Sequence, residues 1–191
     1  TLFRSVMIYP IVIYGHQTLR SETQDIDKNY PELDKLIEDM FQTMYNAEGI
    51  GLAAPQIGLS IRLFVVDLTV MADDDKDSEF MGYKKVFINP RIIEFGDELD
   101  TYNEGCLSLP GINETVKRPT KIRIQYLNEK FEACDEVIEG FKARAIQHEY
   151  DHLEGKVFID HVSPIRRQMN KSKLSALAKG KVRCHYRVKT A

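Results

Sequence analysis

The chain has 191 residues, of which 43% are hydrophobic and 29% are charged. This composition is typical of one globular domain, or at most two small ones, and it excludes a disordered chain and a collagen-like repeat. No apolar run reaches the roughly 18 residues of a membrane-spanning helix, so no membrane partner is expected. Three cysteines are too few for a disulfide scaffold, which favours a reduced, cytoplasmic setting.

The charge is distributed unevenly along the chain. Residues 161–191 contain nine basic residues and no acidic one, whereas the preceding 160 residues contain 17 basic and 29 acidic ones. A basic tail on an acidic body indicates contact with an anionic partner, with a solvated helix end as the alternative.

The N-terminal segment 6–14 is apolar and follows Arg4, as in a weak signal peptide. Pro10 interrupts it and no small-residue cleavage site follows, so we expect a strand instead. Because the chain begins at Thr1 and Met7 would suit a native start, residues 1–6 are interpreted as a remnant of processing.

Residues 31–47 give the clearest helical pattern. Pro31 suits the first turn, and Gly49 lies just past the end. The apolar residues recur at i, i+3 and i+4 and predict one buried face: Leu33, Leu36, Ile37, Met40, Phe41, Met44 and Tyr45.

Strand patterns fill the middle of the chain. Residues 61–68 are apolar and β-branched and predict a buried strand, and residues 86–95 predict a strand broken by a proline. Residues 73–79 are acidic and predict a mobile loop. Residues 121–127 alternate between apolar and polar side chains and lead through a turn into residues 131–137, which predicts a hairpin.

Helical spacing returns near the C-terminus. Residues 140–153 predict a helix that ends before Gly155, and residues 163–178 predict a terminal helix. Strands gathered between two helices favour the α+β class. We expect one catalytic domain in residues 1–165, followed by a basic C-terminal helix and tail in residues 166–191.

The sequence His148-Glu149-Tyr150-Asp151-His152 is the sharpest local feature. Side chains at i and i+4 share one helix face, so two imidazoles can reach one metal ion. Glu149 can then reach a water on that metal and act as its base. The alternative is a surface helix with two solvated histidines, but Phe141 and Ala145 continue the same stripe and favour inward-facing histidines.

A catalytic metal site needs a third ligand. An extended zinc-peptidase pattern would place a histidine at position 158, which is phenylalanine, so that pattern is excluded. Spacing alone does not choose among the other candidates, but Cys106 is preferred because Gly105 allows close backbone approach. The alternative is a buried cysteine that packs as a small hydrophobic residue. The remaining candidates are Cys134, Cys184, His16, His161, His185 and the carboxylates.

Residues 49–58 (GIGLAAPQIG) have little side-chain bulk, so their backbone groups can approach a ligand closely. They do not match a phosphate-binding loop. The alternative is a loop that ends a helix and packs tightly. Gln56 is the one long polar side chain between Gly51 and Gly58, and it can donate hydrogen bonds to an oxyanion.

Taken together, residues 49–58, 104–110 (EGCLSLP) and 147–155 (QHEYDHLEG) resemble the three signature motifs of the peptide deformylases. Residues 7–20 are similar to the opening segment of that family, so the resemblance covers roughly residues 7–165. It implies an α+β fold with mixed or antiparallel sheets around the helix that bears the HExxH motif. It also implies a metal-dependent hydrolase that removes the formyl group from the N-terminal formylmethionine of newly synthesised proteins, by attack of a metal-bound water on the formyl carbon.

The resemblance also implies roles for individual residues. Cys106, His148 and His152 match the metal ligands and Glu149 matches the catalytic acid and base. The oxyanion hole would consist of Gln56 and the backbone N–H of Leu107. The metal of the family is commonly Fe²⁺, and Ni²⁺, Co²⁺ or Zn²⁺ occur in preparations.

Substrate contacts are expected around this centre. Ile50, Phe141 and Ala145 are expected to form an apolar pocket for the methionine side chain. The backbone groups of Ile50, Gly51 and Gly105 would pair with the peptide as an added strand. Glu104 is grouped with these residues and is expected to pair with Arg118 behind the site.

The partners implied are N-formylmethionyl nascent peptides, together with the ribosome through the basic tail, and no sequence-specific nucleic acid. The setting would be the bacterial cytoplasm, with an organellar origin left open. Two alternatives remain, a zinc endopeptidase and a non-catalytic module that binds the ribosome or RNA. We expect the tail to serve docking or terminal packing, so that removal of residues from about 166 spares hydrolysis of small formyl peptides.

Overall fold

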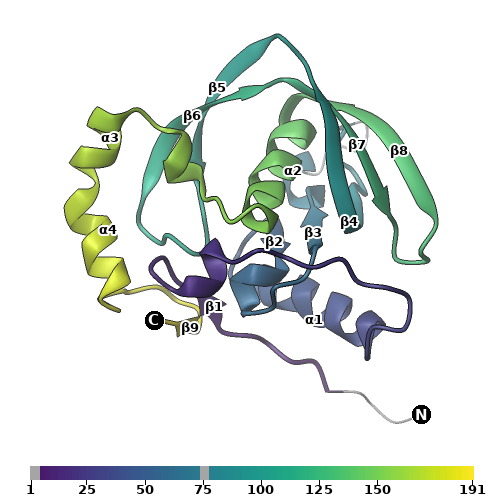
Figure 1. Cartoon of the computed structure of the whole chain (residues 1–191), viewed down its shortest axis with the longest axis horizontal. Coiled ribbons are helices and arrows are strands. Elements are labelled where there is room, and N and C mark those ends of the chain that lie inside the picture. Colours follow the sequence, from purple (N-terminus) through teal and green to yellow (C-terminus); the bar gives the residue numbers. More distant parts are fainter. Residues whose placement is uncertain (1–4, 74–77) are drawn as a thin grey trace.

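The computed structural model describes residues 5–73 and 78–191. Its largest sheet has five antiparallel strands in the order β2-β3-β4-β7-β8 (Figure 1). Strands β5 and β6 form a separate antiparallel pair, and β1 pairs with β9 in parallel. The strands are β1 (Ile11–Val12), β2 (Gly51–Ala53), β3 (Leu63–Asp67), β4 (Lys84–Phe95), β5 (Leu99–Gly105), β6 (Asn113–Pro119), β7 (Lys121–Leu127), β8 (Ala133–Glu139) and β9 (Val188–Lys189).

Four α-helices accompany the strands in the described part of the chain. They are α1 (Leu33–Asn46), α2 (Gly140–Leu153), α3 (Pro164–Met169) and α4 (Lys171–Ala178). Short 3₁₀ turns, η1 to η4, lie at Gln17–Arg20, Ala54–Ile57, Thr69–Ala72 and Phe158–His161. Figure 1 shows α2, which carries the HExxH sequence, in the centre of the molecule with the sheets around it. The predicted α+β architecture is therefore confirmed.

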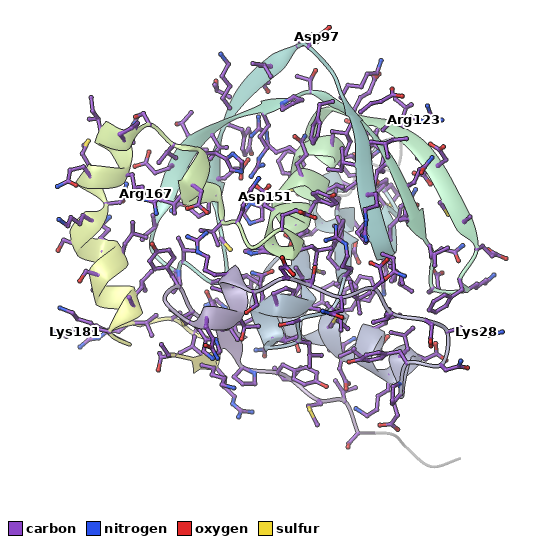
Figure 2. All side chains as sticks on the ribbon, in the orientation of Figure 1. Lys28, Asp97, Arg123, Asp151, Arg167 and Lys181 are labelled. Carbon is purple, nitrogen blue, oxygen red and sulfur yellow. The ribbon has the colours of Figure 1, made fainter. Side chains whose placement is uncertain are left out.

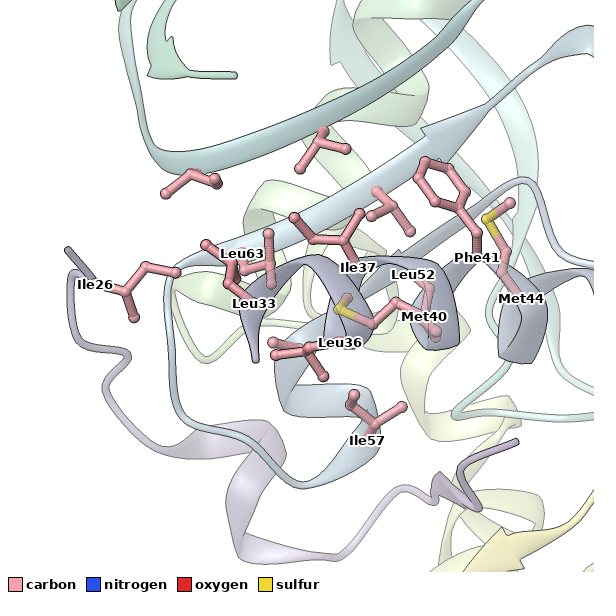
Figure 3. Packing of buried hydrophobic residues seen from close by; sticks show 14 of the residues in the cluster. Ile26, Leu33, Leu36, Ile37, Met40, Phe41, Met44, Leu52, Ile57 and Leu63 are labelled. Atoms are coloured by element: carbon pink, nitrogen blue, oxygen red, sulfur yellow. The ribbon is translucent and has the colours of Figure 1, made fainter. Parts of the chain in front are cut away.

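The central sheet is covered by a helix on each face, because the side chains of a strand alternate between the faces. Leu63 and Val65 of β3 pack in one cluster with α1, which Figure 3 shows from close by. Phe64 and Val66 of the same strand pack in a second cluster with Ala143 and other residues of α2. This packing places α2 against the sheet next to β2, with its histidine-bearing end beside the glycine-rich segment.

Most of the predicted elements are present. The helices predicted over residues 31–47 and 140–153 are α1 and α2, and the predicted hairpin is the β7–β8 pair. The strand predicted over residues 86–95 lies within β4. Its register shifts near Pro90, where Asn89 takes a positive φ of 51°. The acidic loop predicted over residues 73–79 includes residues 74–77, which lie outside the described residues.

Two predicted elements differ from the structure. Only Ile11–Val12 of the predicted N-terminal strand is paired, because in the described part of the chain its strand partner is the short β9 alone. The terminal helix predicted over residues 163–178 is divided into α3 and α4 at Asn170. The buried side-chain amide of Asn170 donates to Glu114 at 2.6 Å and to the carbonyl of Arg166 at 3.0 Å, and these bonds fix the break between the two helices.

The C-terminal tail packs against the body of the molecule. Leu174 and Leu177 of α4 are buried in a third cluster with Ile13, Leu109 and other residues. All nine basic residues of the tail are exposed, and Figure 2 shows Lys181 at the outer edge beyond α4. In the residues that the structure describes, no helix is long and apolar enough to cross a membrane.

Candidate active site

The two histidines of α2 lie one turn apart, and their ring centroids are 5.4 Å from each other. His152 is fully buried and His148 is nearly so, as the stripe on this helix predicts. Both rings therefore face the interior, where an imidazole needs a polar or metal partner.

Cys106 follows β5 and lies next to these histidines. Its Sγ lies 3.4 Å from Nε2 of His152, and the ligand atoms of Cys106, His148 and His152 all lie within 4.8 Å of one another. A sulfur and a nitrogen bound to one tetrahedral metal at ordinary bond lengths are roughly 3.5 Å apart. The spacing and the donor types thus fit a divalent transition metal.

The charge state of Cys106 suits this arrangement. Burial by itself raises the pKa of a thiol, but the neighbouring His152 and His148 outweigh it and lower the pKa of Cys106 to about 5. The side chain is therefore a thiolate at neutral pH, which is the form that binds metals.

Glu149 places a carboxylate next to the three donor side chains. Its side chain is 6% exposed, and its Oε2 has no hydrogen-bond partner among the described residues. Burial raises the pKa of this carboxyl to about 7, against the opposing pull of His148 and His152. A carboxyl that titrates near neutral pH can both accept and return a proton.

The glycine-rich segment lies directly against this carboxylate. A Cβ atom on Gly51 would overlap the Glu149 carboxylate. Only glycine at this position therefore leaves the carboxylate its place beside β2, which gives the unusual composition of residues 49–58 a steric reason.

Gln56 and Leu107 present N–H groups beside the three donor side chains. The Oε1 of Gln56 accepts the N–H of Ala53 at 2.9 Å, so its amide nitrogen points the other way. That Nε2 lies 3.5 Å from Sγ of Cys106 and 3.2 Å from Oγ of Ser108. The backbone N–H of Leu107 has no acceptor among the described residues. The Leu107 N–H is therefore available to an oxyanion, and the Gln56 amide nitrogen, which donates to Cys106 and Ser108, points to the same place.

A cleft of about 420 Å³ opens onto this cluster. All of the sequence-predicted site residues line it except His152, which is fully buried. Its apolar wall contains Phe141, which packs edge to face against Tyr102 at 5.4 Å. Five further lining residues are not among those predicted from the sequence: Glu48, Met71, Tyr102, Asn103 and Arg144.

Comparison with known proteins agrees with this geometry. A sequence model described as polypeptide deformylase matches residues 8–168. The chain belongs to this family. Its members are metal-dependent amide hydrolases that remove the N-formyl group from nascent peptides.

Individual deformylases match over nearly the whole chain. The chain is 46% identical over 188 residues to the peptide deformylase of Christiangramia forsetii, covering 96% of each sequence. It is 47% identical over 184 residues to that of Cytophaga hutchinsonii, covering 96% of this chain and 97% of the relative. The crystal structure of a peptide deformylase from Legionella pneumophila superposes with a TM-score of 0.78 at 36% identity, covering 93% of this chain and 99% of that one.

Glu104 lines the deformylase cleft and forms the centre of a buried ionic network. Its carboxylate accepts from Nε and Nη2 of Arg118 at 2.7 and 2.9 Å, as expected, and from Nη1 of Arg144 at 2.7 Å. Its Oε2 also lies 2.9 Å from Nδ1 of His148. Burial raises the pKa of this carboxyl, but His148 and Arg118 outweigh it and hold the pKa well below its usual range.

This network makes Glu104 a residue that supports the site. Its oxygens contact two arginines and His148, so the side chain orients the imidazole through the nitrogen that faces away from Cys106. The sequence signal for Arg144 was its position four residues before His148, on the same face of α2.

Proposed function

We propose that this chain removes the formyl group from N-terminal formylmethionine, with one divalent metal ion bound by Cys106, His148 and His152. The observation that carries the proposal is the convergence of a thiolate and two imidazoles at a cleft that also presents a buried, unpaired carboxylate. These groups are what metal-assisted hydrolysis of an amide needs: a metal site, a proton carrier and oxyanion donors.

The proposed chemistry assigns each step to a side chain or a backbone group. When bound, the metal supplies a Lewis acid that lowers the pKa of water and polarises the formyl carbonyl. The carboxylate of Glu149 takes the proton of the attacking water and later returns it to the departing amine. Nε2 of Gln56 and the N–H of Leu107 donate to the formyl oxygen as negative charge develops on it.

Substrate orientation is proposed to come from the edge of the central sheet. Strand β2 is an edge strand and Ile50 lies just before it, so the N–H of Ile50 and the backbone groups of Gly51 can pair with an extended peptide, while the Ile50 carbonyl accepts from Asp67. Gly105 lines the same cleft. Phe141 and Ala145 line the apolar part of the cleft, where the flexible thioether chain of methionine would pack.

The test is a comparison of three peptides that differ only at the N-terminus. A formyl-Met peptide should release formate, whereas the acetylated peptide and a longer peptide with only internal bonds should be stable. Cleavage of internal bonds would support a zinc endopeptidase instead, and no hydrolysis of any peptide by metal-loaded protein would contradict the proposal.

We propose Fe²⁺ as the cellular metal, with Ni²⁺, Co²⁺ and Zn²⁺ as alternatives that the same donors accept. The Cys106 thiolate is readily oxidised beside a redox-active metal. We therefore predict that exposure to air inactivates the iron-loaded enzyme, whereas the nickel-loaded enzyme keeps its activity. Activity half-lives and mass analysis of oxygen added to Cys106, with Cys134 and Cys184 as internal references, check this prediction. Equal half-lives would contradict it.

We further propose that the enzyme works in the cytoplasm and that the exposed basic tail docks it on the ribosome. Residues 1–165 contain every proposed catalytic and metal-binding residue, while the tail presents its positive charges to solvent. Reversing the charges of Lys171, Lys173 and Lys181 should weaken ribosome binding and reduce its salt dependence, with hydrolysis of small formyl peptides unchanged. Binding that is unaffected by the reversal would exclude the tail as the docking element.

A further inference from the structure

The last residues of the chain return to the catalytic side of the molecule. Strand β9 pairs with β1, and the N–H groups of Ile11 and Ile13 donate to the carbonyls of Arg187 and Lys189, each at 2.9 Å. Tyr186 lies immediately before this pairing, and its ring packs against the cluster around α1. The strand pairing therefore fixes the position of Tyr186.

Tyr186 reaches the turn that carries the proposed oxyanion donor. Its phenolic Oη donates a hydrogen bond to the carbonyl of Leu107 at 2.8 Å, across 79 residues of sequence. The ring is half-buried, and burial raises the pKa of its hydroxyl, so the group stays protonated and can donate at neutral pH.

In the turn around Leu107, each of the four successive carbonyls of residues 106–109 accepts a hydrogen bond. Three of these carbonyls accept backbone N–H groups, and only the Leu107 carbonyl is bound by a side chain in the described residues. The four acceptors and their donors are Cys106 with Leu109 at 2.9 Å, Leu107 with Tyr186 at 2.8 Å, Ser108 with Tyr14 at 2.8 Å and Leu109 with Ile112 at 3.2 Å.

The carbonyl and the N–H of Leu107 belong to two peptide planes that share one Cα atom. Because each plane is rigid, anchoring the carbonyl restricts rotation at Leu107 and with it the direction of the N–H group. A donor to an oxyanion must lie at about 2.7–3.1 Å from the oxygen, and a displacement of about 1 Å has a large effect on rate. The direction of this N–H therefore depends on two anchors, the Cys106 carbonyl of its own plane, which accepts from Leu109, and the Leu107 carbonyl of the next plane, which accepts from Tyr186.

We infer that Tyr186 is a positioning residue, which fixes the Leu107 peptide so that its N–H meets the formyl oxygen in the transition state. The inference rests on the proposed function, since it assigns to Leu107 the role of oxyanion donor. It gives the C-terminal tail a part in the reaction that is separate from docking and does not involve its positive charges.

The test is Tyr186→Phe, which keeps the packed ring and removes only the hydroxyl. We expect kcat to fall about tenfold with KM changed less than about twofold, because the anchored N–H acts in the transition state and not in ground-state binding. The matched control is Tyr30→Phe. Tyr30 packs against the same cluster, and its hydroxyl has no hydrogen bond in the described part of the chain, so this variant should retain wild-type kinetics.

A second measurement is independent of turnover. Hydrogen exchange at the Leu107 amide, followed by NMR, should be faster in Tyr186→Phe than in the wild type, with metal content and unfolding temperature unchanged. The Tyr30→Phe variant should leave this exchange rate unaltered.

The outcomes separate the two levels of inference. Absence of deformylation by the wild-type enzyme would contradict the proposed function itself. Wild-type activity with unchanged kcat and unchanged amide exchange in Tyr186→Phe would overturn the positioning role alone. A parallel loss of kcat, metal content and unfolding temperature would also overturn it, because it would indicate a merely structural role.

Discussion

Replacing Glu149 with glutamine is expected to lower kcat by about 10³-fold while metal content stays at the wild-type level. Positioned general acid–base catalysis contributes about 10²–10⁴-fold, and an amide cannot carry the proton. Glu149 lies beside the three donor side chains and is not one of them, so metal binding does not depend on its charge. Formate release from a formyl-Met peptide, together with metal analysis of the same preparation, measures both quantities.

The isosteric change keeps the shape of the site, which makes its effect on folding small. Burial penalises the ionised carboxylate, as the raised pKa of about 7 records, so a neutral amide should not lower the unfolding temperature. Glu139→Gln, the same chemical change at an exposed residue just before α2, serves as the control. Near-wild-type turnover by metal-loaded Glu149→Gln would remove Glu149 from the mechanism.

The local parts of this site were predictable because short-range geometry determines them. The spacing of His148 and His152 requires only a helix, and the bounds of α2 match the predicted ones. The glycine-rich segment was identified by its lack of bulk. The reason for that lack, the Glu149 carboxylate beside Gly51, needed the packing of α2 against β2.

The long-range parts were not predictable from spacing. Cys106 is 46 residues from His152, and five other cysteines and histidines or any carboxylate would have satisfied the same chemical requirement. The fold places the end of β5 beside α2 and so brings Cys106 to the two histidines. In the same way, the sequence places Arg144 on the helix face of His148, but its hydrogen bond to Glu104 could not be predicted from spacing.

The C-terminal tail illustrates the same limit. Its charge pattern indicated a solvated or docking element whose removal would spare hydrolysis of small peptides. Two apolar residues, Leu174 and Leu177, are too few to predict a buried face from the sequence, yet both are buried. The short strand β9 also pairs with β1. With Tyr186 bound to Leu107, we now expect removal of the tail to reduce both stability and turnover.

Glu104→Ala is expected to lower the free energy of unfolding by about 3–5 kcal/mol. The substitution removes the carboxylate that the buried guanidinium groups of Arg118 and Arg144 share. Arg118 keeps its pair with Asp151 at 2.8 Å, whereas Arg144 keeps hydrogen bonds to the carbonyls of Val116 and Asp100 only. Breaking a buried ion pair by removing one partner is costly because the remaining charge stays desolvated. Urea unfolding at neutral pH measures this loss.

The matched control is Glu139→Ala, which removes the same side chain from an exposed pair with Lys121. Exposed pairs contribute about 0–1 kcal/mol, so the control variant should unfold almost as the wild type does. A loss at Glu104 no larger than at Glu139 would show that the buried network does not stabilise the fold.

Glu104→Gln separates the stabilising role of Glu104 from its effect on the metal site. The glutamine keeps the shape and one acceptor oxygen, so it should cost less stability than alanine does. It removes the carboxylate that accepts from Nδ1 of His148, and loss of such an orienting partner typically weakens metal binding by about 10–100-fold. Competition against a chelator measures this affinity. If Glu104→Gln binds metal as tightly as the wild type, the network serves folding only, and His148 is oriented by its packing in α2 and against Phe158.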